Sequence, residues 1–169
     1  IGYTAGNGGL QRLDVYYGGK LADKWYISGG GFYRTSTGIR DTQYPADEGG
    51  QISVNLTRKL DGGELSLWGR ATREKNTFFT GIPLVSSDNG SSINGYPGID
   101  ALTGALQGNA LRNVTIETTP GAKPGQMALD LADGRGLTSQ MFGVDFNQKF
   151  GSWTFSDKAG FMSGQVPTK

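Results

Sequence analysis

The sequence predicts an all-β fold, an antiparallel up-and-down meander of about six long strands. In six segments, apolar and polar residues alternate with period 2, as they do when successive side chains point to opposite faces of a strand. Short connections alternate with long ones between these segments, which is typical of a meander with tight turns at one rim and large loops at the other. Each segment runs about 10–12 residues, the length that a tilted strand needs to cross hydrocarbon. We therefore expect the sheet to be part of a large transmembrane β-barrel, with short periplasmic turns and long extracellular loops.

The first four expected strands form two hairpins. The strands at 10–19 and 24–34 are joined by residues 20–23, and the strands at 50–60 and 64–74 are joined by a turn that contains two glycines. The second strand contains three consecutive glycines, which indicate a bend in the wall or a close approach of backbone. The residues expected on the apolar face are Leu13, Val15 and Tyr17, then Trp25 and Ile27, then Ile52, Val54 and Leu56, and finally Leu65 and Leu67.

The last two expected strands, 138–149 and 153–163, meet at a turn formed by Gly151 and Ser152. Asp157 interrupts the apolar face of the second of them. The apolar residues that share a face are Phe142, Val144 and Phe146 in one strand, and Trp153, Phe155, Ala159 and Phe161 in the other.

Two long connections, 35–48 and 75–137, are expected to be the extracellular loops. The longer one is rich in Gly, Ser, Asn and Pro, and a connection of that length is uncommon inside a compact domain. We expect it to contain small elements of its own. Residues 114–117 predict a short strand, and residues 127–132 predict either a strand or one helical turn.

The residue inventory excludes several kinds of chemistry. The chain has no Cys and no His, which removes disulfides, thiolate sites and every mechanism that needs an imidazole. It contains neither a phosphate-binding glycine loop nor a serine nucleophile elbow. Sixteen basic and fifteen acidic residues leave a net charge of +1, so no global field attracts nucleic acid. The sequence predicts no enzyme, no catalytic residue, no metal site, no cofactor and no nucleic-acid partner.

Aromatic residues gather beside the tight turns. A ring with an apolar body and a polar edge is stabilised at the boundary between hydrocarbon and lipid headgroups. The aromatics predicted at that boundary are Trp25, Tyr26, Trp153 and Phe155. The alternative interpretation is that these rings cap the core of a β-sandwich.

Several stretches, taken in succession, resemble a known family. They are residues 29–51 (GGGFYRTSTGIRDTQYPADEGGQ), 81–84 (GIPL), 93–100 (INGYPGID), 130–134 (DLADG) and 153–159 (WTFSDKA). In this order they are similar to the barrel of TonB-dependent outer-membrane receptors of alphaproteobacterial type. The resemblance covers nearly the whole chain, and its strength lies in the succession because no single motif is a strict signature.

This resemblance implies active uptake of a scarce nutrient across the bacterial outer membrane. Members of the family bind a ferric siderophore, cobalamin or an oligosaccharide and import it with energy that TonB supplies through a plug domain. The implied partners are outer-membrane lipid, the remainder of the barrel and its plug, TonB through that plug, and a small nutrient ligand. Candidate ligand-binding residues in the two loops are Arg40, Tyr44, Phe78 and Phe79.

The sequence departs from the family in that it contains no plug, no TonB box and no C-terminal aromatic strand. Receptors of this kind close with about 22 strands, and six strands would leave two edges open in lipid. We therefore expect residues 1–169 to be a partial barrel, an internal segment of a larger receptor. Two other hypotheses remain: a soluble β-sandwich that binds or hydrolyses carbohydrate, and a β-rich fibre whose edges pair with identical copies.

Overall fold

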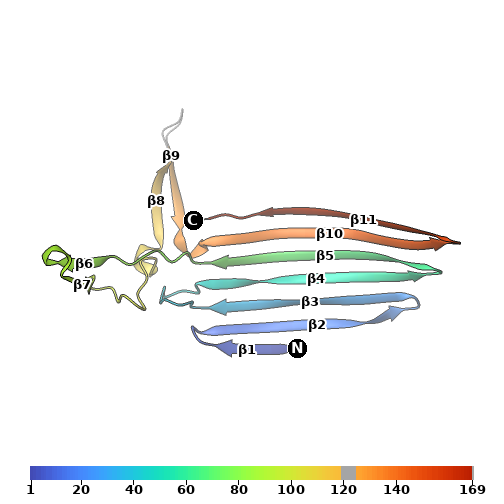
Figure 1. The fold of residues 1–169 in the computed structure, drawn as a ribbon, viewed down its shortest axis with the longest axis horizontal. Coiled ribbons are helices and arrows are strands. Elements are labelled where there is room, and N and C mark those ends of the chain that lie inside the picture. Colours follow the sequence, from blue (N-terminus) through green and yellow to red (C-terminus); the bar gives the residue numbers. More distant parts are fainter. Residues whose placement is uncertain (119–124, 169) are drawn as a thin grey trace.

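The computed structural model describes residues 1–118 and 125–168, and it is all-β (Figure 1). Seven strands form one antiparallel sheet in the order β1-β2-β3-β4-β5-β10-β11. Each strand pairs with the next one along the chain, except that β5 pairs with β10, from which a long segment separates it in sequence. The bounds are β1 Gly2–Gly6, β2 Leu10–Ala22, β3 Trp25–Ser36, β4 Asp47–Leu60, β5 Gly63–Asn76, β10 Arg135–Phe150 and β11 Trp153–Gln165.

All six strands expected from the sequence are confirmed, and each is longer than its alternating core. The prediction missed β1, because its five residues include two glycines and leave too few side chains to show a period. Because the strands that flank them extend further than predicted, the two long loops are shorter than expected and cover 37–46 and 77–134. Within the described part of the second loop, the short strand predicted near 114–117 is confirmed as β8, Asn113–Thr118.

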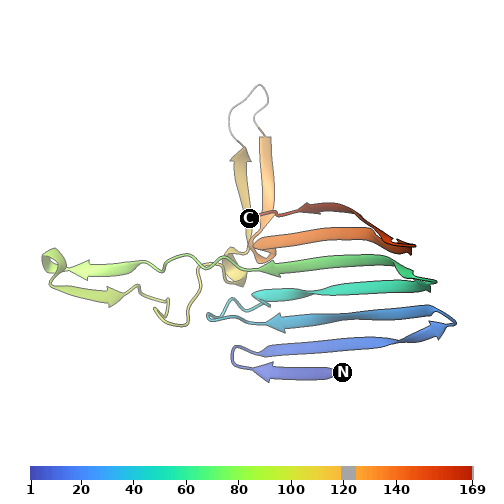
Figure 2. The same cartoon turned by 45° about the vertical axis from the view of Figure 1, so that its right-hand side comes forward.

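Two small hairpins leave the sheet within the second loop (Figures 1 and 2). One is formed by β6, Leu84–Ser87, and β7, Ser92–Gly95; the other pairs β8 with β9, Gly125–Asp130. The segment predicted as either strand or helical turn contains both, because β9 is followed by the 3₁₀ turn η3, Leu131–Asp133. Two further 3₁₀ turns are η1, Asp88–Gly90, and η2, Asn109–Leu111. No helix long and apolar enough to cross a membrane occurs among the described residues.

The connections divide between the two rims of the sheet (Figure 1). The β2–β3, β4–β5 and β10–β11 connections are tight turns of two residues each and lie at one rim, called here the turn side. Both long loops lie at the other rim, the loop side, together with the turn that joins β1 to β2. There the Thr37 amide donates to the Gly8 carbonyl at 2.7 Å, which ties this turn to the first long loop.

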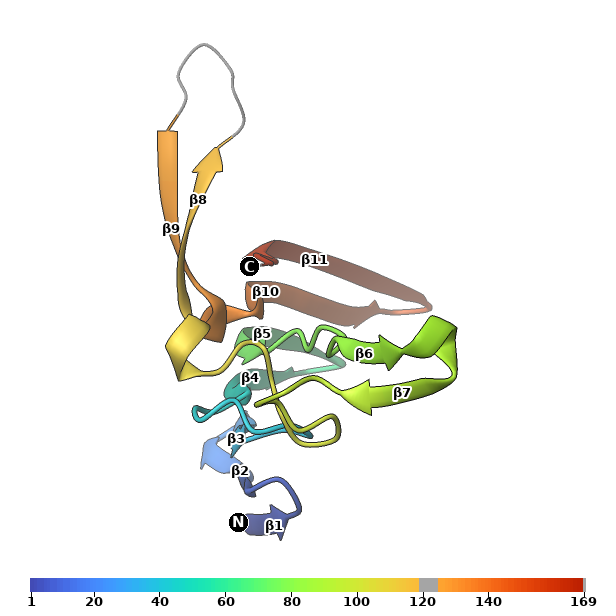
Figure 3. The ribbon, with the colours of Figure 1, turned by 90° about the vertical axis from the view of Figure 1, so that its left-hand side faces the viewer.

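The sheet is a single layer with no packed core beneath it (Figure 3). The chain exposes 11835 Å², whereas a compact monomer of 17.9 kDa exposes about 8,000 Å². The buried apolar residues of the described chain are Tyr44, Ala46 and Ala132, and all three lie outside the centre of the sheet. Both faces of the sheet are therefore open to whatever surrounds the protein.

Alternation along the strands sorts the side chains onto two chemically different faces. We call them the apolar face and the polar face. The apolar face includes Leu13, Val15, Tyr17, Ile27, Ile52, Val54, Leu56, Leu65, Leu67, Phe142, Val144, Phe146 and Phe161. The polar face includes Arg12, Asp14, Tyr16, Ser28, Arg34, Gln51, Ser53, Asn55, Thr57, Trp68, Arg70, Thr72, Glu74, Asp145 and Asn147.

Candidate functional site

The apolar side chains form a band that crosses the sheet diagonally. On three strands the band is a run of three alternating residues centred on a valine: Val15 on β2, Val54 on β4 and Val144 on β10. In the register of the sheet, Val15 lies opposite Gly31 of β3, and Val54 lies opposite Gly29. Val144 lies opposite Leu67 of β5, which lies opposite Leu56 of β4. Leu56 in turn lies opposite Ile27 of β3, so Val144 and Ile27 stand in the same cross-strand row. The centre of the band therefore moves by two residues for every two strands crossed.

A shift of one residue per strand defines a tilt. One residue advances about 3.3 Å along a strand, and neighbouring strands lie about 4.8 Å apart, so the band makes an angle of roughly 35° with the perpendicular to the strands. A closed barrel with the same ratio, eight strands and a shear of 8, has a strand tilt of about 36°. Strands of outer-membrane barrels are tilted by about 35–45° relative to the bilayer normal. The tilt read from the band lies at the edge of that range.

The band has matching boundaries on distant strands. If the centre of the band shifts by one residue on every strand, it falls at Gly30 on β3, at Trp68 on β5 and at Lys158 on β11. Trp25 and Trp153 each lie five residues from that level on the turn side, and Arg73 lies five residues from it on the loop side. Five residues of a strand tilted by 35° correspond to about 14 Å of height, close to half of the ~25 Å apolar band of an outer-membrane barrel.

The aromatics predicted at a membrane boundary fall on different faces. Trp25 lies on the apolar face under the guanidinium of Arg58, at 5.3 Å from its ring centre, and Trp153 is 80% exposed on the same face. Phe155 shares that face but lies nearer the band centre. Tyr26 lies on the polar face, because it alternates with Trp25.

One acidic residue lies inside the band. Asp157 is on the apolar face of β11, one residue from the level of the centre, and it is exposed on this edge strand. The interruption expected from the sequence is thus present in the structure.

The loop-side part of the polar face carries paired charges. Arg12 donates to Asp14 through two of its nitrogens, and its guanidinium lies 4.0 Å from the ring centre of Phe32. On the neighbouring strands, Arg34 Nε lies 3.4 Å from Glu74 Oε1. Gly49 stands between these two in register, and the absent side chain leaves room for the pair to approach across β4.

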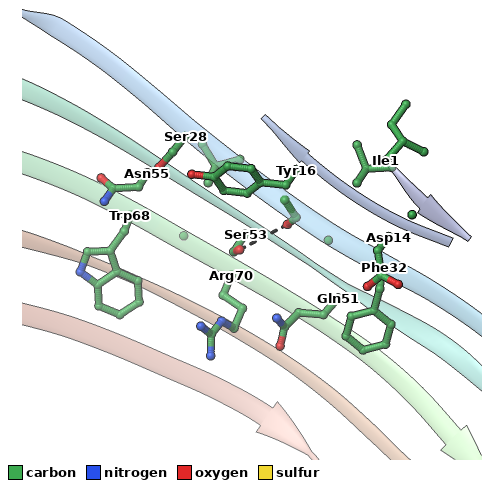
Figure 4. A pocket seen from close by; sticks show the side chains of 17 residues that line it. Ile1, Asp14, Tyr16, Ser28, Phe32, Gln51, Ser53, Asn55, Trp68 and Arg70 are labelled. Atoms are coloured by element: carbon green, nitrogen blue, oxygen red, sulfur yellow. Dashed lines mark hydrogen bonds between the residues drawn. The ribbon is translucent and has the colours of Figure 1, made fainter. Parts of the chain in front are cut away.

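Further toward the turns, the polar face is hollowed over Gly30 (Figure 4). The hollow holds about 620 Å³ and is bordered by Tyr16 and Trp68, with the Ser53 hydroxyl donating to the Gly30 carbonyl at 3.3 Å. Trp68 lies against the next strands, where a side chain at Gly143 would come within 2.5 Å of its ring. Other polar residues that line the hollow are Asp14, Ser28, Gln51, Asn55 and Arg70.

The two long loops form a small packed cluster at their base. The Tyr44 hydroxyl donates to the Gln107 carbonyl at 2.5 Å, and Gln107 Nε2 donates to the carbonyl of Phe78 at 2.9 Å. Arg40 donates to the carbonyl of Gly104 at 3.1 Å. The buried members of this cluster are Thr42, Tyr44, Ala46, Thr77, Gln107 and Ala132. Residues from one loop thus order residues more than sixty positions away in the other.

An ion pair closes the base of the β8–β9 hairpin. Arg112 Nε and Nη2 donate to the two carboxylate oxygens of Asp130, each at 2.7 Å, and the same carboxylate accepts from the Ala132 amide at 2.9 Å. These hydrogen bonds, that of Arg112 first, lower the pKa of Asp130 to about 2. The guanidinium also lies 5.4 Å from the ring centre of Tyr44, whose pKa is raised by burial.

The four residues predicted to bind a ligand lie in or beside this loop cluster. Arg40 and Tyr44 use polar atoms to join the loops to each other. Phe78 is 47% exposed with the guanidinium of Arg135 4.0 Å from its ring centre, and Phe79 packs against Gly38. Ligand contact by these residues stays a prediction. Sequence reasoning missed Gln107 and Arg112 and did not predict that Asp130 pairs with Arg112, because no periodic pattern connects these residues with their partners.

Comparison with known proteins adds no relative. No family model, no curated protein and no solved structure matches this chain. Among residues 1–118 and 125–168, no group of three or more acidic, His or Cys side chains could hold a metal ion.

Proposed function

We propose that this chain forms part of the wall of a transmembrane β-barrel in the bacterial outer membrane, and that the barrel is a TonB-dependent receptor that imports a scarce nutrient. The observation that carries the membrane part is the apolar band, which shifts by one residue per strand over the sheet. In a soluble sheet, nothing requires the apolar side chains of successive strands to lie in a band tilted at a constant angle to the strands. A lipid bilayer does require such a band, because its hydrocarbon has a fixed thickness and tilted strands cross it at an angle.

The open edges favour a larger barrel. β1 and β11 are the outer strands of the sheet, and unpaired backbone at a sheet edge is costly in hydrocarbon. Further strands of the same barrel would pair with both edges and close the wall. The polar face would then line the lumen, and its hollow beside Tyr16 and Trp68 would face the plug or the path of the nutrient.

The receptor part rests on the resemblance of the loops and strands to TonB-dependent receptors. The loop cluster supports it, because a packed base at the loop side gives an outward-facing binding surface a fixed shape. The nutrient would be a ferric siderophore, cobalamin or an oligosaccharide.

Topology in living cells tests the membrane part. The chain has no cysteine, so a single cysteine introduced by Ser91→Cys or Ser152→Cys can be labelled with a membrane-impermeant maleimide. Ser91 lies in the β6–β7 hairpin and Ser152 in the β10–β11 turn. We expect intact cells to label position 91 alone and lysed cells to label both, with the unsubstituted protein giving the background. Equal labelling of both positions in intact cells would contradict a barrel that crosses the membrane.

Uptake tests the receptor part. Cells that lack the gene should lose high-affinity import of one of the three nutrient classes, and collapse of the proton gradient should abolish the same import in normal cells. Unchanged import of all three classes would refute the receptor assignment while leaving the membrane wall in place.

A further inference from the structure

We infer that the outward side of β5 binds the phosphate of an outer-leaflet lipid headgroup, through Arg73 and Lys75. This inference rests on the proposed membrane setting of the apolar face. It assigns a ligand class to a part of that face that the transport function does not use.

The two cations stand beside a hollow at the loop-side boundary of the band. Arg73 lies between Gly50 of β4 and Thr138 of β10, and the next residue on the same face is Lys75. Because glycine contributes no side chain, the surface beside Arg73 is recessed. The recess holds about 970 Å³, and the other residues of the apolar face that line it are Tyr33, Glu48, Ile52, Ala71, Gly136, Gln140 and Pro167.

Their height matches that of lipid phosphates. Arg73 and Lys75 lie five and seven residues from the level of the band centre on β5. At a tilt of 35°, these offsets correspond to about 14 Å and 19 Å from the middle of the bilayer. The apolar band of an outer-membrane barrel ends about 12–13 Å from its middle, and the headgroup region of a typical bilayer extends to about 20–22 Å. The acyl chains of the same lipid would lie against Ile52 and Ala71, directly below the hollow.

Two cations and three carboxylates border the hollow: Arg73 and Lys75, with Glu48, Glu74 and Asp133. Glu74 is paired with Arg34 on the polar face. Lys75 Nζ lies 3.3 Å from Glu48 Oε2, and the other oxygen of that carboxylate accepts from the Tyr33 hydroxyl at 2.7 Å. Arg73 forms no ion pair with any residue that the structure describes. A guanidinium presents a planar pair of donors that fits two phosphate oxygens.

The opposite boundary of the same face is different. There Arg58 lies over the ring of Trp25, and the neighbouring turns present aromatic side chains. The asymmetry indicates that phosphate binding belongs to the loop side.

Lipid retained by the natural protein, extracted whole from its membrane in mild detergent, tests the inference. The combined variant Arg73→Gln, Lys75→Gln should retain about tenfold less lipid with a phosphorylated headgroup by native mass spectrometry, as expected for the loss of charge-assisted hydrogen bonds. Two matched controls should retain the normal amount: Arg70→Gln, on the polar face of the same strand, and Arg58→Gln, at the other boundary. The single variant Arg73→Lys keeps the charge and should retain most of the lipid, which keeps the test valid if the double variant does not assemble.

Three outcomes would overturn the inference. The first is unchanged lipid in the double variant, or in Arg73→Gln alone. The second is an equal loss in Arg58→Gln. The third is complete displacement of the lipid by inorganic phosphate, because it would show a site for a free anion only. Absence of the unsubstituted protein from the membrane fraction would overturn the proposed function itself, and this inference with it.

Discussion

Single glycines decide how closely the strands and their charged side chains approach in this sheet. Gly49 has a φ of 150°, and a Cβ added there would clash with the Arg73 carbonyl oxygen and lie 2.5 Å from Glu74 Cα. Both contacts are with neighbouring backbone, which cannot move aside without disturbing the pairing of β4 with β5. Gly69, on β5, is the opposite case, because the nearest atom to an added Cβ is 3.8 Å away.

We expect Gly49→Ala to lower the free energy of unfolding by about 1–3 kcal/mol, the usual cost of a strained backbone position. Gly69→Ala should leave it unchanged or raise it slightly, because alanine restricts the unfolded chain. Denaturant unfolding of the two variants in the same lipid checks both. An equal loss in both variants would show that the effect comes from glycine replacement in general.

The ion pair between Arg112 and Asp130 sets a pH dependence at the loop base. Because the pKa of Asp130 is lowered to about 2 in the folded protein, the pair stabilises that state above the ordinary aspartate pKa. The stabilisation is lost as the pH falls from about 4 toward 2. We expect Arg112→Gln to raise the pKa of Asp130 toward its ordinary value, measured by NMR titration of the carboxyl carbon. A midpoint that stays near 2 in the variant would assign the low pKa to another cause.

At the scale of elements, the strands form a wall whose faces differ in what they tolerate. Val54 is at the centre of the band on β4, and Ser53 is its immediate neighbour on the polar face. In the proposed membrane wall, these two positions would share a strand and nearly the same depth but would face lipid and lumen, respectively.

We therefore expect Val54→Arg to cost about 2–4 kcal/mol, the penalty for a cation on the lipid face at the bilayer midplane. Ser53→Arg should cost much less, because in the proposed barrel the polar face lines a lumen that contains water. The amount of each variant that assembles in the membrane, followed by its unfolding from lipid vesicles, measures the difference. Similar costs at both positions would mean that the two faces see the same medium.

The strands were predictable from the sequence because period 2 is a local signal that long strands repeat many times. Six of the seven strands in the large sheet follow from that pattern, and β1 does not because it is too short. The β6–β7 hairpin also escaped prediction, since its four-residue strands lie in a segment dominated by Ser, Asn and Gly. The contact of Tyr44 with Gln107 joins residues 63 positions apart, and nothing periodic in the sequence connects them.

At the scale of the whole molecule, the sheet is a single layer that depends on its surroundings. The apolar side chains on one face form a band that is tilted relative to the strands. The other face carries charges and a hollow, and the outer edges of the sheet are unpaired. These properties agree with the proposed arrangement, in which lipid covers one face, the lumen lies on the other, and further strands pair with both edges.

In the proposed membrane wall, the apolar face meets lipid along the diagonal band. The most direct test places a fluorescent label, one at a time, on cysteines introduced by Val15→Cys, Val54→Cys and Val144→Cys, and measures quenching by nitroxides at different depths in the bilayer. We expect all three labels to report the same depth near the bilayer centre. A label at Ile52→Cys, which shares the cross-strand row of Val15, should report a position nearer the loop side. Quenching of a label at Ser53→Cys as strong as that at Val54→Cys, or equal depths for positions 15 and 52, would contradict the account.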